Sequence, residues 1–169
     1  MRFYFLVIVF LMFVNSFAQT SYFKGTIEET IQLANSENKR LVLVFGNNYC
    51  LVCEKLKKQF FENVEIGKFI NDHFIVREVR AVVKSEEGKL IYEDTPDGRL
   101  SKKYEVSGFP MVVIVDVTDI KNPKQVIRMK GINIEMINKK IVETLFPVDQ
   151  KYDYKIDEIK KVFEKYSKD

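Results

Sequence analysis

The chain has few side chains that could hold a metal. Among its 169 residues there are two cysteines and one histidine, His73, whereas a structural zinc site takes four ligands. His73 stands at the expected end of a helix, where a cation complements the helix dipole, and this position accounts for it better than a role as ligand or base. Neither a metal site nor a cofactor is therefore predicted.

Charge of one sign and long apolar runs are scarce as well. The 27 basic residues against 24 acidic ones leave a net charge of +3, and the basic residues do not gather into one block. This balance argues against a nucleic-acid partner. After residue 18 no segment is apolar enough to span a membrane, no internal repeat is present, and the length suits one domain.

The first eighteen residues differ from the rest and have the pattern of a signal peptide. Arg2 precedes an apolar run at residues 3–14, and Ser16-Phe17-Ala18 is a small-x-small cleavage pattern. An uncleaved anchor is the alternative, but this run is shorter than the roughly 20 residues that span a bilayer. The lack of a nearby cysteine argues against a lipoprotein. We expect residues 1–18 to be cleaved and the mature protein to be periplasmic or secreted.

The most informative stretch is residues 41–62, LVLVFGNNYCLVCEKLKKQFFE. Five apolar residues predict a buried strand, Gly46-Asn47-Asn48 predicts a turn, and a helical pattern follows from Cys53. A C-x-x-C at the first turn of a helix brings both sulfurs within bonding reach. The unsatisfied N–H groups and the dipole of the helix favour a thiolate at Cys50.

Hydrophobic periodicity and turn signals predict the remaining elements. The first half of the chain is predicted to form a helix from 27 that ends around 35–39, with Thr26 and Glu29 as a capping box, the strand from 41, the cysteine helix to 62, a helix from 64 capped by Asn63, and a strand at 74–83. A surface insertion at 84–98 that can form a hairpin follows. The second half is predicted to form a short helix at 100–106, strands at 111–117 and 125–130, a helix marked by Ile134, Ile137, Ile141 and Leu145, and an amphipathic helix at 152–166. This alternation predicts an α/β fold with a mixed sheet and helices on both faces.

Three motifs in this order resemble the thioredoxin superfamily. They are LVLVFGNNYCLVC at 41–53, KKYEVSGFPMVVIVD at 102–116 and VIRMKGINIEMINKKI at 126–141. The resemblance covers about residues 26–146 and is closest to exported domains of bacterial disulfide exchange. It implies a thioredoxin-like fold with a central mixed sheet of about four to five strands flanked by helices. We expect this domain at 19–146, with the C-terminal amphipathic helix at 147–169 packed on it.

The resemblance also implies roles for individual residues. Cys50 would be the attacking thiol, Cys53 the buried resolving thiol, and Pro110 a cis-proline facing the pair. The residues expected to contact substrate are Tyr49, Leu51, Val52, Phe109 and Pro110.

The chain departs from the family pattern at four places. Val44 stands where thioredoxin has a buried aspartate, so the acid that helps move a proton from the resolving thiol is missing or comes from elsewhere. Tyr49 replaces a tryptophan, and Lys58 replaces the proline that kinks the helix. The dipeptide Leu51-Val52 supplies no charge that would stabilise a thiolate, which weakly favours a reducing pair.

These features predict an exported thiol–disulfide oxidoreductase that reduces protein disulfides, is re-reduced by a membrane electron donor and acts as a monomer. One alternative is a binding or scaffold protein that has lost turnover. Another is a dimeric disulfide isomerase or chaperone that uses the C-terminal apolar stripe as its seam. An inert structural disulfide is disfavoured because a loop this short removes little unfolded-state entropy.

Overall fold

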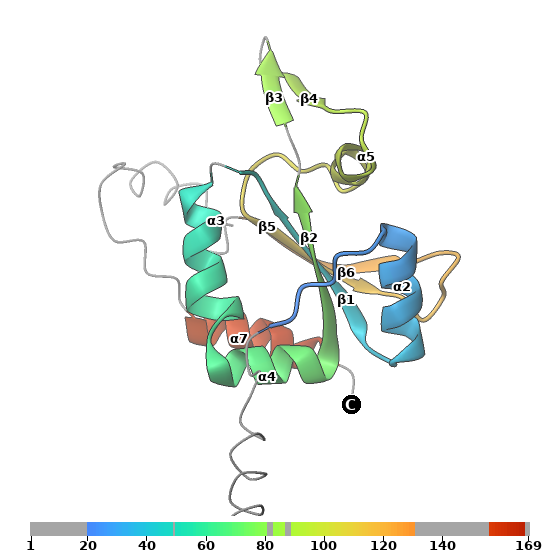
Figure 1. Ribbon diagram of the computed structural model, residues 1–169, viewed down its shortest axis with the longest axis vertical. Helices are drawn as coiled ribbons and strands as arrows, with labels where there is room; N and C mark the ends of the chain where they lie inside the picture. The colour runs from blue at the N-terminus through green and yellow to red at the C-terminus, as the bar shows by residue number, and fades with distance from the viewer. Residues whose placement is uncertain (1–19, 49, 81–82, 87–88, 131–155, 168–169) are drawn as a thin grey trace, which may run out of the picture.

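The computed structural model describes residues 20–48, 50–80, 83–86, 89–130 and 156–167 (Figure 1). Its elements are, in chain order, α2 (Ile27–Ser36), β1 (Arg40–Gly46), α3 (Leu51–Leu56), the π-helical turn η2 (Lys57–Phe61), α4 (Val64–His73), β2 (Phe74–Arg80), β3 (Val83–Glu86), β4 (Lys89–Tyr92), α5 (Pro96–Lys103), β5 (Met111–Asp116), β6 (Lys124–Lys130) and α7 (Ile156–Lys165). No helix among these residues is both long and apolar enough to cross a membrane.

The central sheet has four strands in the order β2-β1-β5-β6. β1 runs parallel to β2 and antiparallel to β5, and β5 runs antiparallel to β6. The predicted mixed sheet flanked by helices is confirmed. β1 and β5 lie in its middle, which explains why LVLVF and MVVIV are apolar without alternation: both faces of these strands are buried.

One side of the sheet, here called the cysteine face, is covered by α3, η2, α4 and α7 (Figure 1). Its core is rich in aromatic rings, with Phe60, Phe61, Phe74 and Phe163 all buried and packed edge-on or tilted against one another. α7 therefore contributes directly to this core through Ile159 and Phe163.

The other side, here called the Arg77 face, is covered by α2 and α5. Its core is mainly aliphatic, and Ala34, Val79 and Leu100 meet the inward side chains of β1 and β5 there. Arg77 lies on this side of β2 with only 11% of its side chain exposed. The two faces thus differ in packing, with an aromatic core on one side and a mainly aliphatic core on the other.

The helix starts follow the capping signals in the sequence. Thr26 accepts from the Glu29 N–H while the Glu29 side chain accepts from the Thr26 N–H, which confirms the capping box. Asn63 caps α4 through bonds to Glu65 and Ile66. These caps fix where α2 and α4 begin and hence how they lie on the sheet.

The β3–β4 hairpin begins at Val83, one residue before the expected insertion at 84–98, and projects from the top of the sheet in Figure 1. The expected helix at 100–106 is wrong in its bounds, because α5 spans Pro96–Lys103. Thr95 caps it by accepting from the Gly98 N–H at 3.0 Å, and Pro96 occupies a first-turn position where its missing N–H costs nothing.

Other expectations fall outside the described residues. These are the signal peptide at 1–18, the helix marked by Ile134 to Leu145, and Tyr49. The lead-in before α2 contains a pairing that the sequence did not indicate. Tyr22 forms a parallel bridge with Val76, and the Phe23 N–H donates to the Val76 carbonyl at 2.8 Å.

Candidate functional site

Cys50 and Cys53 form a disulfide at the start of α3, with their Cα atoms 5.1 Å apart. Cys50 is the N-cap residue, and its sulfur accepts a hydrogen bond from the Cys53 N–H at 3.0 Å. The same donor would serve a thiolate at Cys50 after reduction, because an anionic sulfur is a better acceptor than a disulfide sulfur. The strand, turn and helix around the C-x-x-C are thus as predicted.

The two cysteines lie at the carboxyl end of β1. A Cβ at Gly46, the last residue of β1, would lie 3.4 Å from Cys53 Sγ, which is van der Waals contact. The Cys53 sulfur therefore lies directly beside the end of β1. Cys50 and Cys53 are both partly exposed, so the disulfide is open to solvent rather than sealed in the core.

The two residues between the cysteines differ in their exposure to solvent. Leu51 is 84% exposed, while Val52 is half-buried and packs against the core of the cysteine face. An apolar side chain this exposed could be buried against an apolar surface of a partner. Leu51 also follows directly after Cys50, whose sulfur is expected to react.

Pro110 and Phe109 reach the same end of the sheet from β5. The Phe109–Pro110 peptide bond is cis, Pro110 is buried, and Phe109 is half-buried against the core of the Arg77 face. Met111, the next residue, pairs with Phe45 at the end of β1. This register brings the segment that precedes β5 to the edge of the sheet from which the cysteine loop departs.

Two departures from the family pattern have structural counterparts. Val44 is buried on β1, where it pairs with Val112 on one side and Glu78 on the other. Lys58, at the family's kink proline, lies inside the π-helical turn η2. A π-helical turn interrupts a helix much as a proline does, so the cysteine helix is locally irregular without one.

A small cavity lies beside Cys53 on the cysteine face. It measures about 20 Å³, and its walls include Tyr22, Cys53, Glu54, Lys57 and Glu78. No local motif marks Tyr22 or Glu78 as a site residue, because both reach the cavity through strand pairings that only the fold defines.

The pKa of Tyr22 is affected by the burial and the charges around this cavity. Burial first, and then the nearby carboxylates of Glu78, Glu62 and Glu54, raise the pKa of Tyr22 above its usual range. Lys57 Nζ lies 5.2 Å from the centroid of the Tyr22 ring. The phenol therefore stays neutral at physiological pH and forms an uncharged wall of the cavity.

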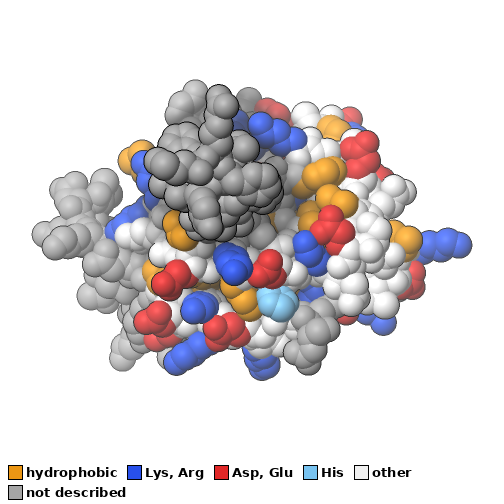
Figure 2. Space-filling model, turned by 60° about the horizontal axis from the view of Figure 1, so that its bottom comes forward, with side chains coloured by type: hydrophobic (Ala, Val, Ile, Leu, Met, Phe, Trp, Pro, Cys, Tyr) orange, Lys and Arg blue, Asp and Glu red, His pale blue; other side chains and the backbone are white. Residues whose placement is uncertain are grey.

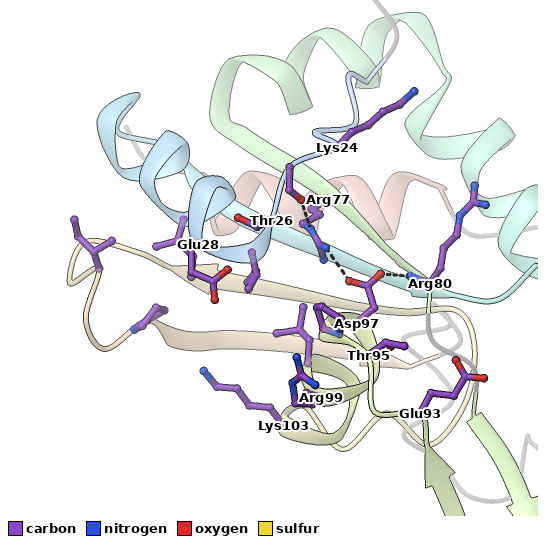
Figure 3. A pocket seen from close by; sticks show the side chains of 17 residues that line it. Lys24, Thr26, Glu28, Arg77, Arg80, Glu93, Thr95, Asp97, Arg99 and Lys103 are labelled. Atoms are coloured by element: carbon purple, nitrogen blue, oxygen red, sulfur yellow. Dashed lines mark hydrogen bonds and ion pairs between the residues drawn. The ribbon is translucent and has the colours of Figure 1, made fainter.

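A larger cavity of about 970 Å³ lies on the opposite side, at the Arg77 face (Figure 3). Neither cysteine, nor Phe109 or Pro110, contributes to its walls. Asp97, in its wall, forms an ion pair with Arg77, whose Nη2 lies 2.7 Å from Asp97 Oδ1. The Arg80 N–H donates to the other carboxylate oxygen, Asp97 Oδ2, at 3.0 Å. Arg77 Nε also donates to the Gly25 carbonyl at 3.1 Å, so this group joins β2, α5 and the lead-in to α2.

The charged surface shows no segregation by sign on the face drawn in Figure 2, where Lys and Arg side chains alternate with Asp and Glu. His73 is the last residue of α4, and its ring centroid lies 4.7 Å from that of Phe69. Among the described residues, no three His, Cys, Asp or Glu side chains cluster in a way that could hold a metal ion.

Comparison with known proteins agrees with this geometry. A family profile described as "Thioredoxin-like domain" matches residues 27–144. No curated protein sequence matches the chain.

Among solved structures, DsbH oxidoreductase is 21% identical with a TM-score of 0.52, over 76% of this chain and 87% of that one. A thioredoxin from Thermus thermophilus is 18% identical with a TM-score of 0.51, over 76% and 88%. A putative disulphide-isomerase from Bacteroides thetaiotaomicron is 20% identical with a TM-score of 0.52, over 78% and 97%. At these identities the structures establish the fold alone.

A thioredoxin-like fold with a disulfide between the two cysteines of a C-x-x-C is consistent with thiol–disulfide exchange. The profile match covers most of the chain, and the chain belongs to the thioredoxin-like domain family.

Proposed function

We propose that this chain is an exported thiol–disulfide oxidoreductase that reduces disulfides in other exported proteins. The observation that carries the proposal is the partly exposed Cys50–Cys53 disulfide at the start of α3, with the Cys53 N–H bonded to Cys50 Sγ. The mature protein would begin near Gln19 after loss of residues 1–18, with the domain at 19–146 and a C-terminal segment at 147–169 that carries α7. Its place would be the periplasm or the extracellular space.

The reaction passes two electrons to a substrate disulfide. The Cys50 thiolate attacks one substrate sulfur, a mixed disulfide forms, and the other substrate sulfur leaves as a thiolate. Cys53 then loses its proton and attacks Cys50 Sγ. The Cys50–Cys53 disulfide forms, and the second substrate sulfur is released and protonated. Substrate is reduced and the C-x-x-C is oxidised.

Substrate would bind around the open side of the disulfide. Leu51 offers an exposed apolar contact, Val52 packs against the core of the cysteine face, and the Phe109–Pro110 segment lies at the same end of the sheet. Tyr49 is proposed as a further contact directly before Cys50. Backbone groups at Phe109 would pair with an extended substrate segment, which suits a protein that acts on varied partners.

Reduction is favoured over oxidation because Leu51 and Val52 bring no positive charge or hydrogen-bond donor to the Cys50 sulfur. A membrane electron donor would regenerate the dithiol. The equilibrium potential of the pair against glutathione tests the direction: a value near −270 mV supports a reductase and one near −120 mV an oxidase.

The direct test is insulin reduction together with trapping by Cys53→Ala. This variant lacks the resolving thiol, so we expect it to accumulate mixed disulfides that Cys50→Ser does not form. Wild-type protein that neither reduces insulin nor forms mixed disulfides, with either oxidised or reduced partners, would overturn the proposal.

A scaffold role remains a second candidate because Val44 brings no acid to the site and Leu51-Val52 is apolar. It predicts that Cys50→Ser rescues cells that lack the protein, whereas an oxidoreductase predicts that it does not. The dimeric isomerase has weaker support, since Ile159 and Phe163 of its suggested seam are buried within this chain. A molar mass of one chain, measured by size-exclusion chromatography with light scattering, would exclude the dimeric isomerase.

A further inference from the structure

The small cavity beside Cys53 bears on a step that the proposed function requires. Cys53 must change from thiol to thiolate before its sulfur can attack the mixed disulfide at Cys50. A group that accepts this proton has to lie within reach of Cys53 Sγ, directly or through one water molecule. The titratable side chains in the walls of the cavity are therefore the candidates.

Four titratable side chains other than Cys53 line the cavity: Tyr22, Glu54, Lys57 and Glu78. Tyr22 keeps its proton, because burial and neighbouring carboxylates raise its pKa. Lys57 in its ammonium form has donors and no acceptor. Two carboxylates remain.

Their positions distinguish Glu78 from Glu54. Glu78 lies on β2 directly beside Val44 of β1, with its side chain 31% exposed and its backbone fixed in the sheet. Glu54 is exposed on the first turn of α3, where water competes for its carboxylate. Adjacent strands are about 4.8 Å apart, so Glu78 approaches the cysteines from the strand next to the one that leads into them.

We propose that Glu78 accepts the proton of the Cys53 thiol, through one water molecule in the cavity, and thereby supplies from β2 the base that Val44 cannot supply from β1. The inference rests on the proposed function. The cavity of about 20 Å³ is large enough for one water molecule, and sulfur, carboxylate and phenol groups around it offer polar partners.

The proton and the electrons balance in this step. The proton passes from Cys53 Sγ through the water to the Glu78 carboxylate. The sulfur's electron pair forms the bond to Cys50 Sγ, and the substrate sulfur leaves with the electrons of the broken bond. Solvent protonates the substrate thiolate and later removes the proton from Glu78, so the carboxylate is ready for the next turnover.

Other charged groups near Glu78 set the pH dependence. Arg80 on β2 lies 3.8 Å from Glu78 Oε2 and also donates to Asn48 Oδ1 at 3.4 Å. Lys57 of η2 and Glu54 of α3 share the cavity walls, and Glu62, next to η2, acts on Tyr22. Variants at Glu78 must be compared with variants at a second carboxylate for this reason.

The first experiment titrates Cys53 alone. Because the chain has only two cysteines, Cys50→Ser leaves a single thiol, whose ionisation is followed by NMR of a ¹³C-labelled cysteine Cβ. A nearby carboxylate disfavours the thiolate, so adding Glu78→Gln should lower the pKa of Cys53. The matched control Glu54→Gln removes the same charge from the same cavity and should have a smaller effect.

The second experiment measures the resolving step in protein with both cysteines. Reduced protein is mixed with oxidised glutathione, quenched with acid and analysed by mass spectrometry for the Cys50–glutathione mixed disulfide. At pH 7 we expect Glu78→Gln to convert this species to the intramolecular disulfide about 100-fold more slowly, the lower part of the usual range for general-base catalysis. The difference should shrink at high pH, where hydroxide ionises Cys53, and Glu54→Gln should stay within about twofold of wild type.

A lower Cys53 pKa together with a slower resolving step supports the assignment. A general loosening of the site does not combine these effects, because a lower pKa by itself would speed the attack at pH 7. Equal titrations and rates in Glu78→Gln and wild type overturn it, as does a larger effect in Glu54→Gln. If wild-type protein forms no mixed disulfide, the proposed function fails, and the titration still decides whether Glu78 acts on Cys53.

Discussion

Arg77 and Glu78 are neighbours on β2, yet their side chains lie on opposite faces of the sheet and differ in exposure and in how closely they are paired. Arg77 has only 11% of its side chain exposed and is held by Asp97 at 2.7 Å and by the Gly25 carbonyl at 3.1 Å. Glu78 lies at the small cavity on the cysteine face, is more exposed, and has a longer ion pair at 3.8 Å with Arg80.

The difference separates two uses of charge in one strand. A largely buried cation with fixed partners holds elements together, and removing a partner leaves a charge that water reaches only poorly. A carboxylate held loosely at a cavity can gain and lose a proton without disturbing the fold. Changes on the Arg77 face should therefore alter stability, and changes around the small cavity should alter exchange.

The largest expected effect tests the packing of the cysteine face itself. Phe163 of α7 is fully buried, with ring centroids 5.1 Å from Phe60 and 5.3 Å from Phe74. Phe163→Ala should lower the free energy of unfolding by about 3–5 kcal/mol through lost burial and a cavity. Urea denaturation measures this, with exposed Lys161→Ala on the same helix as the control. A loss below about 1 kcal/mol would mean that α7 is not part of the core.

The next largest effect is expected from removing the Arg77–Asp97 ion pair on the Arg77 face. Asp97→Ala leaves the Arg77 guanidinium without its carboxylate and the Arg80 N–H without its acceptor, and should cost about 2–3 kcal/mol, less than a fully buried pair because Asp97 is 25% exposed. The control is Asp94→Ala, whose carboxylate is 92% exposed and pairs with Arg99, with an expected change within about 0.5 kcal/mol.

Insulin reduction per folded molecule should be equal in Asp97→Ala and wild type, because Asp97 lines the other cavity. A variant that keeps its stability but loses exchange would contradict the division between the two faces.

Much of the site could be predicted from the sequence, because its signals are local. A strand, a turn and a capped helix are each encoded within a few residues, so the arrangement of residues 41–62 followed from apolar runs, Gly46-Asn47-Asn48 and the cysteine spacing. The α5 boundary was missed for a local reason too. Pro96-Asp97-Gly98 suits a turn, and the same residues also suit a helix start once Thr95 caps it.

The position of Glu78 could not be predicted. It depends on the register of β1 against β2, two strands separated by the whole of α3, η2 and α4. A shift of one residue would turn Glu78 to the Arg77 face and Arg77 toward Cys53. Register comes from the packing of both cores, so the residue that faces Val44 is a property of the fold rather than of any motif.

A smaller, pH-dependent effect comes from Tyr22. Because the pKa of Tyr22 is raised in the folded state, the unfolded chain loses this proton first as pH rises above 10, and stability falls from there upward. The loss reaches about 1.4 kcal/mol for each pH unit at most. Tyr22→Phe should remove this part of the alkaline loss.

Urea denaturation at pH 7 and pH 11 measures the difference. The value at pH 7 reports the lost hydroxyl alone, since the phenol is neutral there in both states. Tyr104, whose pKa is raised by burial, remains in both proteins and gives a shared background. Equal alkaline losses in the two proteins would mean that Tyr22 is as accessible to water as in the unfolded chain.

The smallest effect concerns Leu51, which is 84% exposed and contributes little to the core. Leu51→Ser should leave the free energy of unfolding within about 0.5 kcal/mol of wild type, since surface changes seldom do more. If Leu51 packs against substrate, losing that apolar contact should raise the KM for insulin about threefold to tenfold, from roughly 1 kcal/mol of burial. Val64→Ser, which removes a 61% exposed apolar side chain on α4, is the matched control and should leave KM unchanged. Equal KM values in Leu51→Ser and wild type would mean that Leu51 does not contact substrate and would leave the Phe109–Pro110 segment as the expected contact.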